Sequence, residues 1–308
     1  MSLAVKIKNV SKSYPNAEAL KSITLDIGPN ELFGFIGPDG AGKTTLFRIL
    51  TSLILPDKGT GSIGNFDIVK DYRKIRKEVG YMPGRFSLYG DLTVEENLQF
   101  YARLFNTSIK ENYDLIEDVY KQIEPFKKRR AADLSGGMKQ KLALSCALIH
   151  KPQLIILDEP TTGVDAISRK EFWALLKSMQ QKGITILVST PYMDEAALCD
   201  RVALMQEGNI LTIDRPGQIV QDFSGKILGI KTNQMHALLN DLLQMEQPER
   251  VYRFGAFVHL VTHDNPDACA KKVRSHLEAK GHQNIMIQEQ PASIEDCFLA
   301  LMHKPETP

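Results

Sequence analysis

The sequence predicts an α/β protein built from two folded units. In the first unit, a glycine-rich loop connects an apolar strand at residues 31–36 to a helix at 43–55. Continuous apolar runs follow at 154–157 and 184–188. Continuous apolar strands that alternate with helices are typical of a parallel sheet covered on both faces. The second unit, residues 225–308, follows a β-α-β-β-α-β order, which is typical of a small ferredoxin-like α+β domain.

The remaining elements of the first unit follow from their apolar patterns. Residues 3–10 and 20–27 alternate apolar and polar side chains, as strands with one exposed face do, and the Gly-Pro-Asn sequence at 28–30 marks a turn. Apolar residues at helical spacing predict a mostly helical stretch from about residue 93 to 150 and a helix at 168–182.

The pattern changes near residue 224, where short strands and two helices begin. We expect strands at 227–231, 251–254, 257–261 and 284–288, helices at 235–243 and 266–280, and an amphipathic segment at 294–302. The change predicts two domains, residues 1–224 and 225–308.

Composition excludes several classes of protein. The 308 residues carry 38 basic and 37 acidic side chains, which give a net charge of +1. Nucleic-acid-binding proteins usually carry an excess of basic residues, so we expect no nucleic-acid partner. The four cysteines form no CxxC pair, and a reducing cytosol is the simplest setting. No apolar run approaches the ~20 residues that span a bilayer. If the protein works at a membrane, another chain does the spanning.

Residues 37–44, Gly-Pro-Asp-Gly-Ala-Gly-Lys-Thr, fit the phosphate-loop pattern between a predicted strand and a predicted helix. Glycines let consecutive N–H groups face one anion at the positive end of the helix. Lys43 is expected to reach the terminal phosphates, and the Thr44 hydroxyl to hold Mg²⁺. A turn without a ligand would not require Lys-Thr at this offset. The expected ATP-binding residues of the loop are Gly37, Asp39, Gly40, Ala41, Gly42, Lys43, Thr44 and Thr45, with the Asp39 carboxylate pointing away from the phosphates.

Two carboxylates, Asp158 and Glu159, end the apolar run at 154–157. An open α/β sheet places ligands at the carboxyl ends of its strands. Asp158 is therefore expected to support Mg²⁺, and Glu159 to orient or deprotonate the attacking water as the catalytic residue. An isolated acidic pair after a strand is more often a helix N-cap, but the phosphate loop favours the catalytic interpretation.

The Leu-Ser-Gly-Gly-Met-Lys-Gln segment at 134–140 resembles the signature motif of ABC-transporter ATPases. The phosphate loop precedes this segment, and the acidic pair and a D-loop-like segment at 162–165 follow it. Motifs in this order resemble the ABC family over residues 3 to about 220. Segments at 90–98 and 192–196 resemble the drug-export branch, in which a C-terminal Ile-Glu-Asp-x-Phe segment, here residues 294–298, also occurs.

The resemblance implies a P-loop ABC ATPase core with an antiparallel β subdomain and a helical subdomain at about 85–150. It also implies ATP and Mg²⁺, and a head-to-tail pair of nucleotide-binding domains in which Ser135, Gly136 and Gly137 complete the partner's site. Tyr14 occupies the position of an aromatic that stacks on adenine, although an ordinary strand-end aromatic would look the same. The implied location is cytoplasmic, peripheral on the inner face of the cell membrane, beside a multi-span membrane subunit.

Two positions depart from the family pattern. Gly84 stands where the family has a glutamine that contacts Mg²⁺ and the attacking water, and Pro191 stands where it has a histidine that contacts the γ-phosphate. Neither residue has a side-chain donor. We therefore expect this chain's own ATP site to be catalytically impaired and its partner domain to be catalytically complete. The alternative is that a neighbouring group or water replaces these contacts.

Three functions are considered. The first is an ATP-hydrolysing subunit of an ABC exporter, of multidrug type by resemblance. The second is a regulatory nucleotide-sensing ABC subunit that binds ATP with little hydrolysis. The third, a soluble ABC protein acting in DNA repair or on ribosomes, would require a zinc CxxC insertion, a long coiled coil or two cassettes in one chain, none of which the sequence contains. The transported molecule, the direction of transport and a possible tandem chain stay open.

Overall fold

The computed structural model describes residues 2–245 and 250–302 and divides the chain into two units, Met1–Pro216 and Gly217–Pro308. The division falls earlier than residue 224 because helix α7 (Pro216–Gln221) contacts α10 (Ile294–Met302): the Cys297 thiol donates a hydrogen bond to the Ile219 carbonyl at 3.5 Å. Residue 1 and residues 303–308, at the outer ends of the expected domains, lie outside the described residues.

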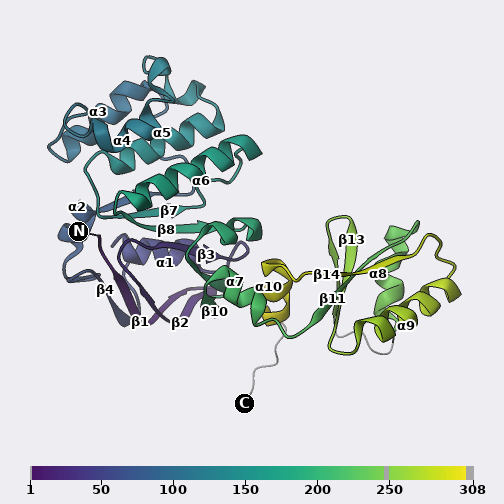
Figure 1. Cartoon of the computed structure of the whole chain (residues 1–308). Helices are drawn as coiled ribbons and strands as arrows, with labels where there is room; N and C mark the ends of the chain where they lie inside the picture. The colour runs from purple at the N-terminus through teal and green to yellow at the C-terminus, as the bar shows by residue number, and fades with distance from the viewer. Residues whose placement is uncertain (1, 246–249, 303–308) are drawn as a thin grey trace. The chain divides into compact units, whose positions relative to one another are not determined.

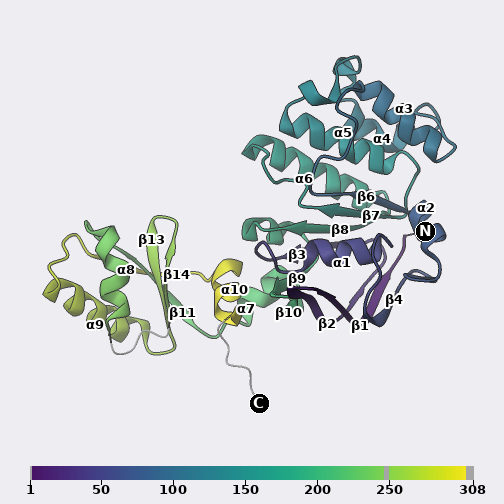
Figure 2. The same cartoon turned by 180° about the vertical axis from the view of Figure 1, so that it is seen from behind.

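The central sheet of the first unit has the strand order β10-β9-β3-β8-β7-β6. Its strands are β3 (Leu32–Ile36), β6 (Val79–Met82), β7 (Leu154–Asp158), β8 (Thr185–Thr190), β9 (Arg201–Gln206) and β10 (Asn209–Asp214). β10 pairs antiparallel with β9, and the other pairs run parallel. Figures 1 and 2 show α1 (Lys43–Leu50) on one face and α6 (Ala166–Gln181) on the other, so the parallel α/β prediction is confirmed.

A second, antiparallel sheet has the order β2-β1-β4-β5. Its strands are β1 (Val5–Tyr14), β2 (Ala17–Ile27), β4 (Lys58–Ile63) and β5 (Phe66–Asp67). β1 runs to Tyr14, beyond the expected end at residue 10. The alternation fails there because Asn9 has a left-handed φ of 52° and the register with β2 shifts between Ile7 and Val10.

Helices α3 (Val94–Leu104), α4 (Tyr113–Tyr120) and α5 (Gly136–Leu148) form the expected helical subdomain. Short 3₁₀ turns η1 (Glu124–Phe126) and η2 (Ala131–Asp133) connect α4 to α5, and α2 (Tyr72–Glu78) precedes β6. Thr93 and Glu96 cap α3 reciprocally, and Ser135 caps α5.

Helix α1 ends at Leu50, five residues before the expected end at 55. The Thr51 hydroxyl donates to the Phe47 carbonyl at 2.8 Å, and Ser52 has a left-handed φ of 55° that no helix continues. Leu53 and Leu55, which extended the apolar period, are 53% and 61% exposed. The periodicity was therefore misleading beyond Leu50.

The second unit has the antiparallel strand order β12-β13-β11-β14. Its elements are β11 (Lys226–Lys231), α8 (Met235–Leu243), β12 (Arg250–Phe254), β13 (Phe257–Thr262), α9 (Pro266–Ala279), β14 (Met286–Gln290) and α10. Leu228, Ile230, Val258 and Leu260 of the sheet share a core with α8 and α9. The β-α-β-β-α-β prediction is confirmed.

On the other side of this sheet, Asp296 of α10 is fully buried. Its Oδ1 accepts hydrogen bonds from Tyr252 Oη at 2.5 Å and from His259 Nδ1 at 2.8 Å, and its Oδ2 accepts from Ser293. Tyr252 and His259 are register partners on β12 and β13. One carboxylate therefore attaches α10 to both strands.

Candidate nucleotide site

The phosphate loop runs from the end of β3 to the start of α1. Its glycines are required by space and conformation. A Cβ atom on Gly37 would lie 2.2 Å from the Met205 carbonyl oxygen, and one on Gly42, whose φ is 102°, would lie 2.4 Å from that of Ala19. Any larger residue would therefore displace the loop from the strands beside it.

Lys43 is buried at the start of α1, with 3% of its side chain exposed. Its ammonium donates to the carbonyls of Gly37 at 2.7 Å and Pro38 at 2.9 Å and lies 3.4 Å from Glu159 Oε1. The loop carbonyls hold the lysine across the loop, so its charge faces the position that an anion would take at the helix N-terminus.

A pocket of about 730 Å³ lies beside the loop. Residues 39–45, Tyr14 and Glu159 line it, together with residues of β2. Tyr14 is 41% exposed at the end of β1, and Asp39 is also exposed. The volume lies in the range of small-molecule and cofactor pockets. The structure therefore brings residues 39–45, the tyrosine and Glu159 to a single pocket, whereas Gly37 and Asp158 do not line it.

Asp158 and Glu159 lie at the carboxyl end of β7. Asp158 is 2% exposed and accepts a hydrogen bond from Ser189 Oγ of β8 at 2.7 Å, while the same Oγ accepts from the Glu159 N–H at 2.9 Å. Ser189, to which no motif gives a role, thus holds both acidic residues. The N-cap of α6 is instead Asp165, whose pKa is lowered chiefly by the Ser168 N–H. The acidic pair does not cap that helix.

The donor set fits Mg²⁺. Thr44 offers a hydroxyl and Asp158 a carboxylate, and Mg²⁺ in nucleotide sites takes one or two such protein oxygens together with phosphate oxygens. In the described part of the chain no group of three or more His, Cys, Asp or Glu side chains could hold a metal by itself. A nucleotide would therefore have to supply the other ligands.

The signature segment lies apart from this pocket. Ser135 caps α5 by accepting from the Met138 N–H at 3.4 Å, and Ser135 and Gly136 are exposed. A Cβ atom on Gly136 would lie 3.3 Å from the Gly163 carbonyl oxygen, and one on Gly137 would lie 2.8 Å from Ser168 Oγ. The structure therefore places the signature segment against the start of α6. Ser135, Gly136 and Gly137 do not line the pocket.

The two departing positions follow the strands on either side of β7. Gly84 follows β6, and a Cβ atom there would lie 3.1 Å from the Asp158 carbonyl oxygen. Pro191 follows β8 directly. Both positions are therefore close to the acidic pair in the fold, although neither carries a side-chain donor.

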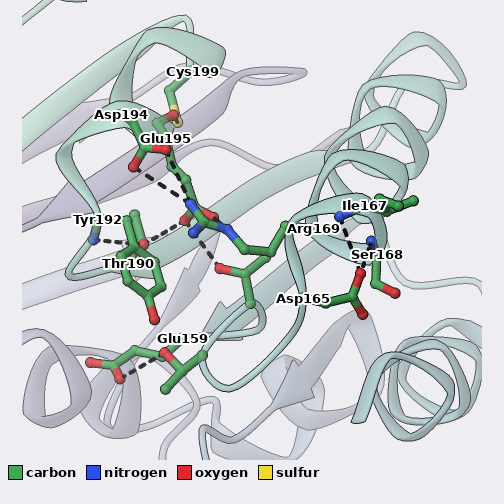
Figure 3. Close-up of polar contacts among 12 residues, drawn as sticks. Glu159, Asp165, Ile167, Ser168, Arg169, Thr190, Tyr192, Asp194, Glu195 and Cys199 are labelled. Carbon is green, nitrogen blue, oxygen red and sulfur yellow. Dashed lines mark hydrogen bonds and ion pairs between the residues drawn. The ribbon is translucent and has the colours of Figure 1, made fainter. Parts of the chain in front are cut away.

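Figure 3 shows polar contacts around Glu195, a residue for which the motifs predict no role. Glu195 of η3 (Met193–Leu198) is 2% exposed. It binds Thr161, Thr190 and Arg169, which come from three separate segments. No sequence spacing signals this cluster, because it exists only where the loops after β7 and β8 meet α6.

Comparison with known proteins gives the family. A protein-family model described as "ABC transporter" matches residues 20–162. Over 303 residues, 97% of the chain, it is 32% identical to the Nod factor export ATP-binding protein I of Mesorhizobium japonicum and covers 86% of that protein. The chain belongs to the ABC transporter ATP-binding family. Its first unit has the fold of an ABC ATPase, as the resemblance implied.

This ABC cassette is also similar to a second curated protein and to a solved structure. It is 35% identical over 305 residues to the probable multidrug ABC transporter ATP-binding protein YbhF of Escherichia coli, and it spans 52% of that protein's length. It is also similar to a solved structure of the ATP-binding cassette MJ0796, described as a dimer in a post-hydrolysis state bound to ADP and Pi. The match covers 68% of this chain and 98% of the MJ0796 chain, with 28% sequence identity and a TM-score of 0.62.

Among residues 2–245 and 250–302, every helix is too short or too polar to cross a bilayer.

Proposed function

We propose that the chain binds and hydrolyses ATP as a subunit of an ABC exporter and energises transport through a separate multi-span membrane subunit. The observation that carries the proposal is the buried Lys43, held by two loop carbonyls beside Glu159 at a pocket of nucleotide size. The names of the relatives, which are multidrug and Nod factor export ATP-binding proteins, support an exporter. The proposed location is the cytoplasmic face of the cell membrane.

Each site residue has a proposed role. The loop N–H groups and Lys43 bind the phosphates, Thr44 and Asp158 bind Mg²⁺, Glu159 activates water, and Tyr14 stacks on adenine. The Mg²⁺ ion would neutralise charge that develops on the phosphates.

The exposed Ser135 and Gly136 support a second nucleotide-binding domain as partner. Polar groups at the N-terminus of α5 suit a phosphate, and they lie outside the chain's own pocket. They would therefore complete the ATP site of the partner domain. The relative MJ0796 is described as a dimer with ADP and Pi, which agrees with such a pairing.

Gly84 and Pro191 support slow hydrolysis at the chain's own loop. Both positions lie beside strands that flank the acidic pair, and loss of one preorganised polar group costs on the order of 10²–10³-fold in rate. We propose ~10²-fold as the combined effect, with a partner domain that retains both missing residues. The same two residues favour the second candidate, a regulatory subunit that binds ATP with little hydrolysis.

ATPase activity of the purified chain tests this proposal. We expect slow turnover that Gly84→Gln/Pro191→His raises and Glu159→Gln abolishes. Turnover of several per second in the unmodified chain would contradict the impaired site and favour a symmetric homodimer. ATP binding without hydrolysis in either form would favour the regulatory subunit.

A further inference from the structure

We propose that Glu195 is a positioning residue that joins the loop after Glu159, the turn at Pro191 and helix α6 into one unit, and so fixes the geometry of the hydrolytic site. This inference rests on the proposed function, because it concerns the same site. It assigns a role to four side chains that the motifs leave unassigned.

The Glu195 carboxylate uses both oxygens. Oε2 accepts from Thr190 Oγ1 at 2.5 Å and from Thr161 Oγ1 at 3.1 Å, and Oε1 accepts from Arg169 Nε at 3.1 Å (Figure 3). With 2% of the residue exposed, the charge has little access to water. A buried carboxylate is stable only when it is paired and hydrogen-bonded, so these three donors must stay in place.

Two of the donors lie next to the hydrolytic site. Thr161 is two residues from Glu159, and Thr190 directly precedes Pro191. Thr190 Oγ1 also accepts from the Tyr192 N–H at 3.1 Å, which fixes the turn on both sides of the proline. Glu195 therefore sets the separation between the loop that carries Glu159 and the turn where the family has its histidine.

The third donor connects the site to α6. Arg169 lies one turn after the N-cap Asp165, its guanidinium carbon is 4.3 Å from the centre of the Tyr192 ring, and its Nη2 reaches Asp194 Oδ2 at 3.2 Å. The start of α6 also packs against Gly137 of the signature segment. A shift of α6 would thus reach Glu195 through Arg169 and change the spacing of the two loops.

Three variants separate positioning from simple packing. Thr190→Val keeps a branched side chain and the Arg169–Glu195 pair but removes the hydroxyl that donates to Glu195, whereas Thr190→Ser keeps that hydroxyl. Glu195→Gln keeps the shape but removes the charge. Because small displacements at a reacting centre cost up to about 10²-fold, we expect Thr190→Val and Glu195→Gln to slow single-turnover hydrolysis by ~10-fold or more. Thr190→Ser should stay within twofold of the unmodified chain.

The matched control is Asp194→Asn, which removes only the charge of the neighbouring, 77% exposed Asp194 beside Arg169 and should leave turnover unchanged. MgATP affinity, measured by calorimetry, should stay within twofold in all variants, because the phosphate loop is intact. Equal turnover in Thr190→Val and the unmodified chain would overturn the inference. So would losses of turnover, affinity and thermal stability in the same proportion. Failure of the unmodified chain to bind MgATP would instead contradict the proposed function.

Discussion

The ammonium of Lys43 lies 3.4 Å from the carboxylate of Glu159, so the two residues proposed to bind the phosphates and to activate water are paired with each other. A bound γ-phosphate would compete with Glu159 for the lysine. Binding would thereby release the carboxylate to face water when the substrate is present. The pairing gives a physical reason for little activation of water at a site without nucleotide.

Lys43→Ala should weaken MgATP binding by about 10- to 150-fold. A charge-assisted hydrogen bond is worth roughly 1.5–3 kcal/mol, and the variant also leaves the Glu159 carboxylate facing the phosphates without its counter-charge. Calorimetric titration measures the loss. Lys6→Ala, which removes an exposed lysine paired with Asp26, is the control. Unchanged affinity in Lys43→Ala would show that the loop does not bind the nucleotide.

Tyr14→Ala should weaken ATP binding about fivefold or more, since stacking of a base on an aromatic ring is worth ~1–3 kcal/mol. Tyr14→Phe, which keeps the ring and removes only the hydroxyl, should bind ATP as the unmodified chain does. Comparing ATP with inorganic triphosphate in the same titration isolates the adenine contribution. If Tyr14→Ala loses affinity for both ligands equally, the ring does not stack on the base.

A chain that ends at Asp214 should fold and bind MgATP within twofold of the full-length chain, because the nucleotide motifs and their core lie in the first unit. A chain that ends at Ser224 should be less soluble. It keeps α7 but lacks α10, so the Ile219 carbonyl loses its hydrogen bond from Cys297, and we expect the Ile219 side chain, 7% exposed in the full chain, to become more exposed. An insoluble chain after truncation at Asp214 would contradict independent folding of the first unit.

Asp296→Asn should destabilise the second unit by about 2 kcal/mol at pH 7. Burial by itself would raise the pKa of Asp296, but hydrogen bonds from His259, Ser293 and Tyr252 outweigh it and lower the pKa from 3.8 to about 2. Because the folded-state pKa is depressed, this stabilisation is complete above pH ~4 and disappears as the pH falls towards ~2.

Hydrogen exchange of the β12 and β13 amides, compared between pH 7 and pH 3, measures this difference. Asp267→Asn, an exposed position in the first turn of α9, is the control and should change protection little. A destabilisation by Asp296→Asn that persists unchanged at pH 3 would mean that packing, rather than the charge, holds α10 in place.

The sequence predicts those parts of the fold and of the site that depend on residues close together in the chain. The phosphate loop and the end of β7 were found because glycines, Lys43 and the acidic pair stand at short, specific offsets. The second unit was found because its strands and helices keep clean periods. The antiparallel sheet was placed through the resemblance, since the Asn9 bulge interrupts the alternation of β1.

The contacts that hold the site together could not be found in this way. Ser189 and Glu195 reach Asp158 and Thr161 across 31 and 34 residues of sequence, through the side-by-side packing of β7 and β8. Serine, threonine and glutamate near strand ends are too common to predict such pairs. Likewise, nothing in the spacing of the apolar residues before Leu53 indicates that the backbone of Ser52 adopts a left-handed conformation.

The contact between Ile219 and Cys297 brings α7, at the start of the second unit, against α10, the last helix that the structure describes in it. A unit whose entry and exit lie together can be inserted into a surface loop of another protein without separating the two ends of that loop. We therefore expect the segment from α7 to α10 to be transferable into such a loop as one piece.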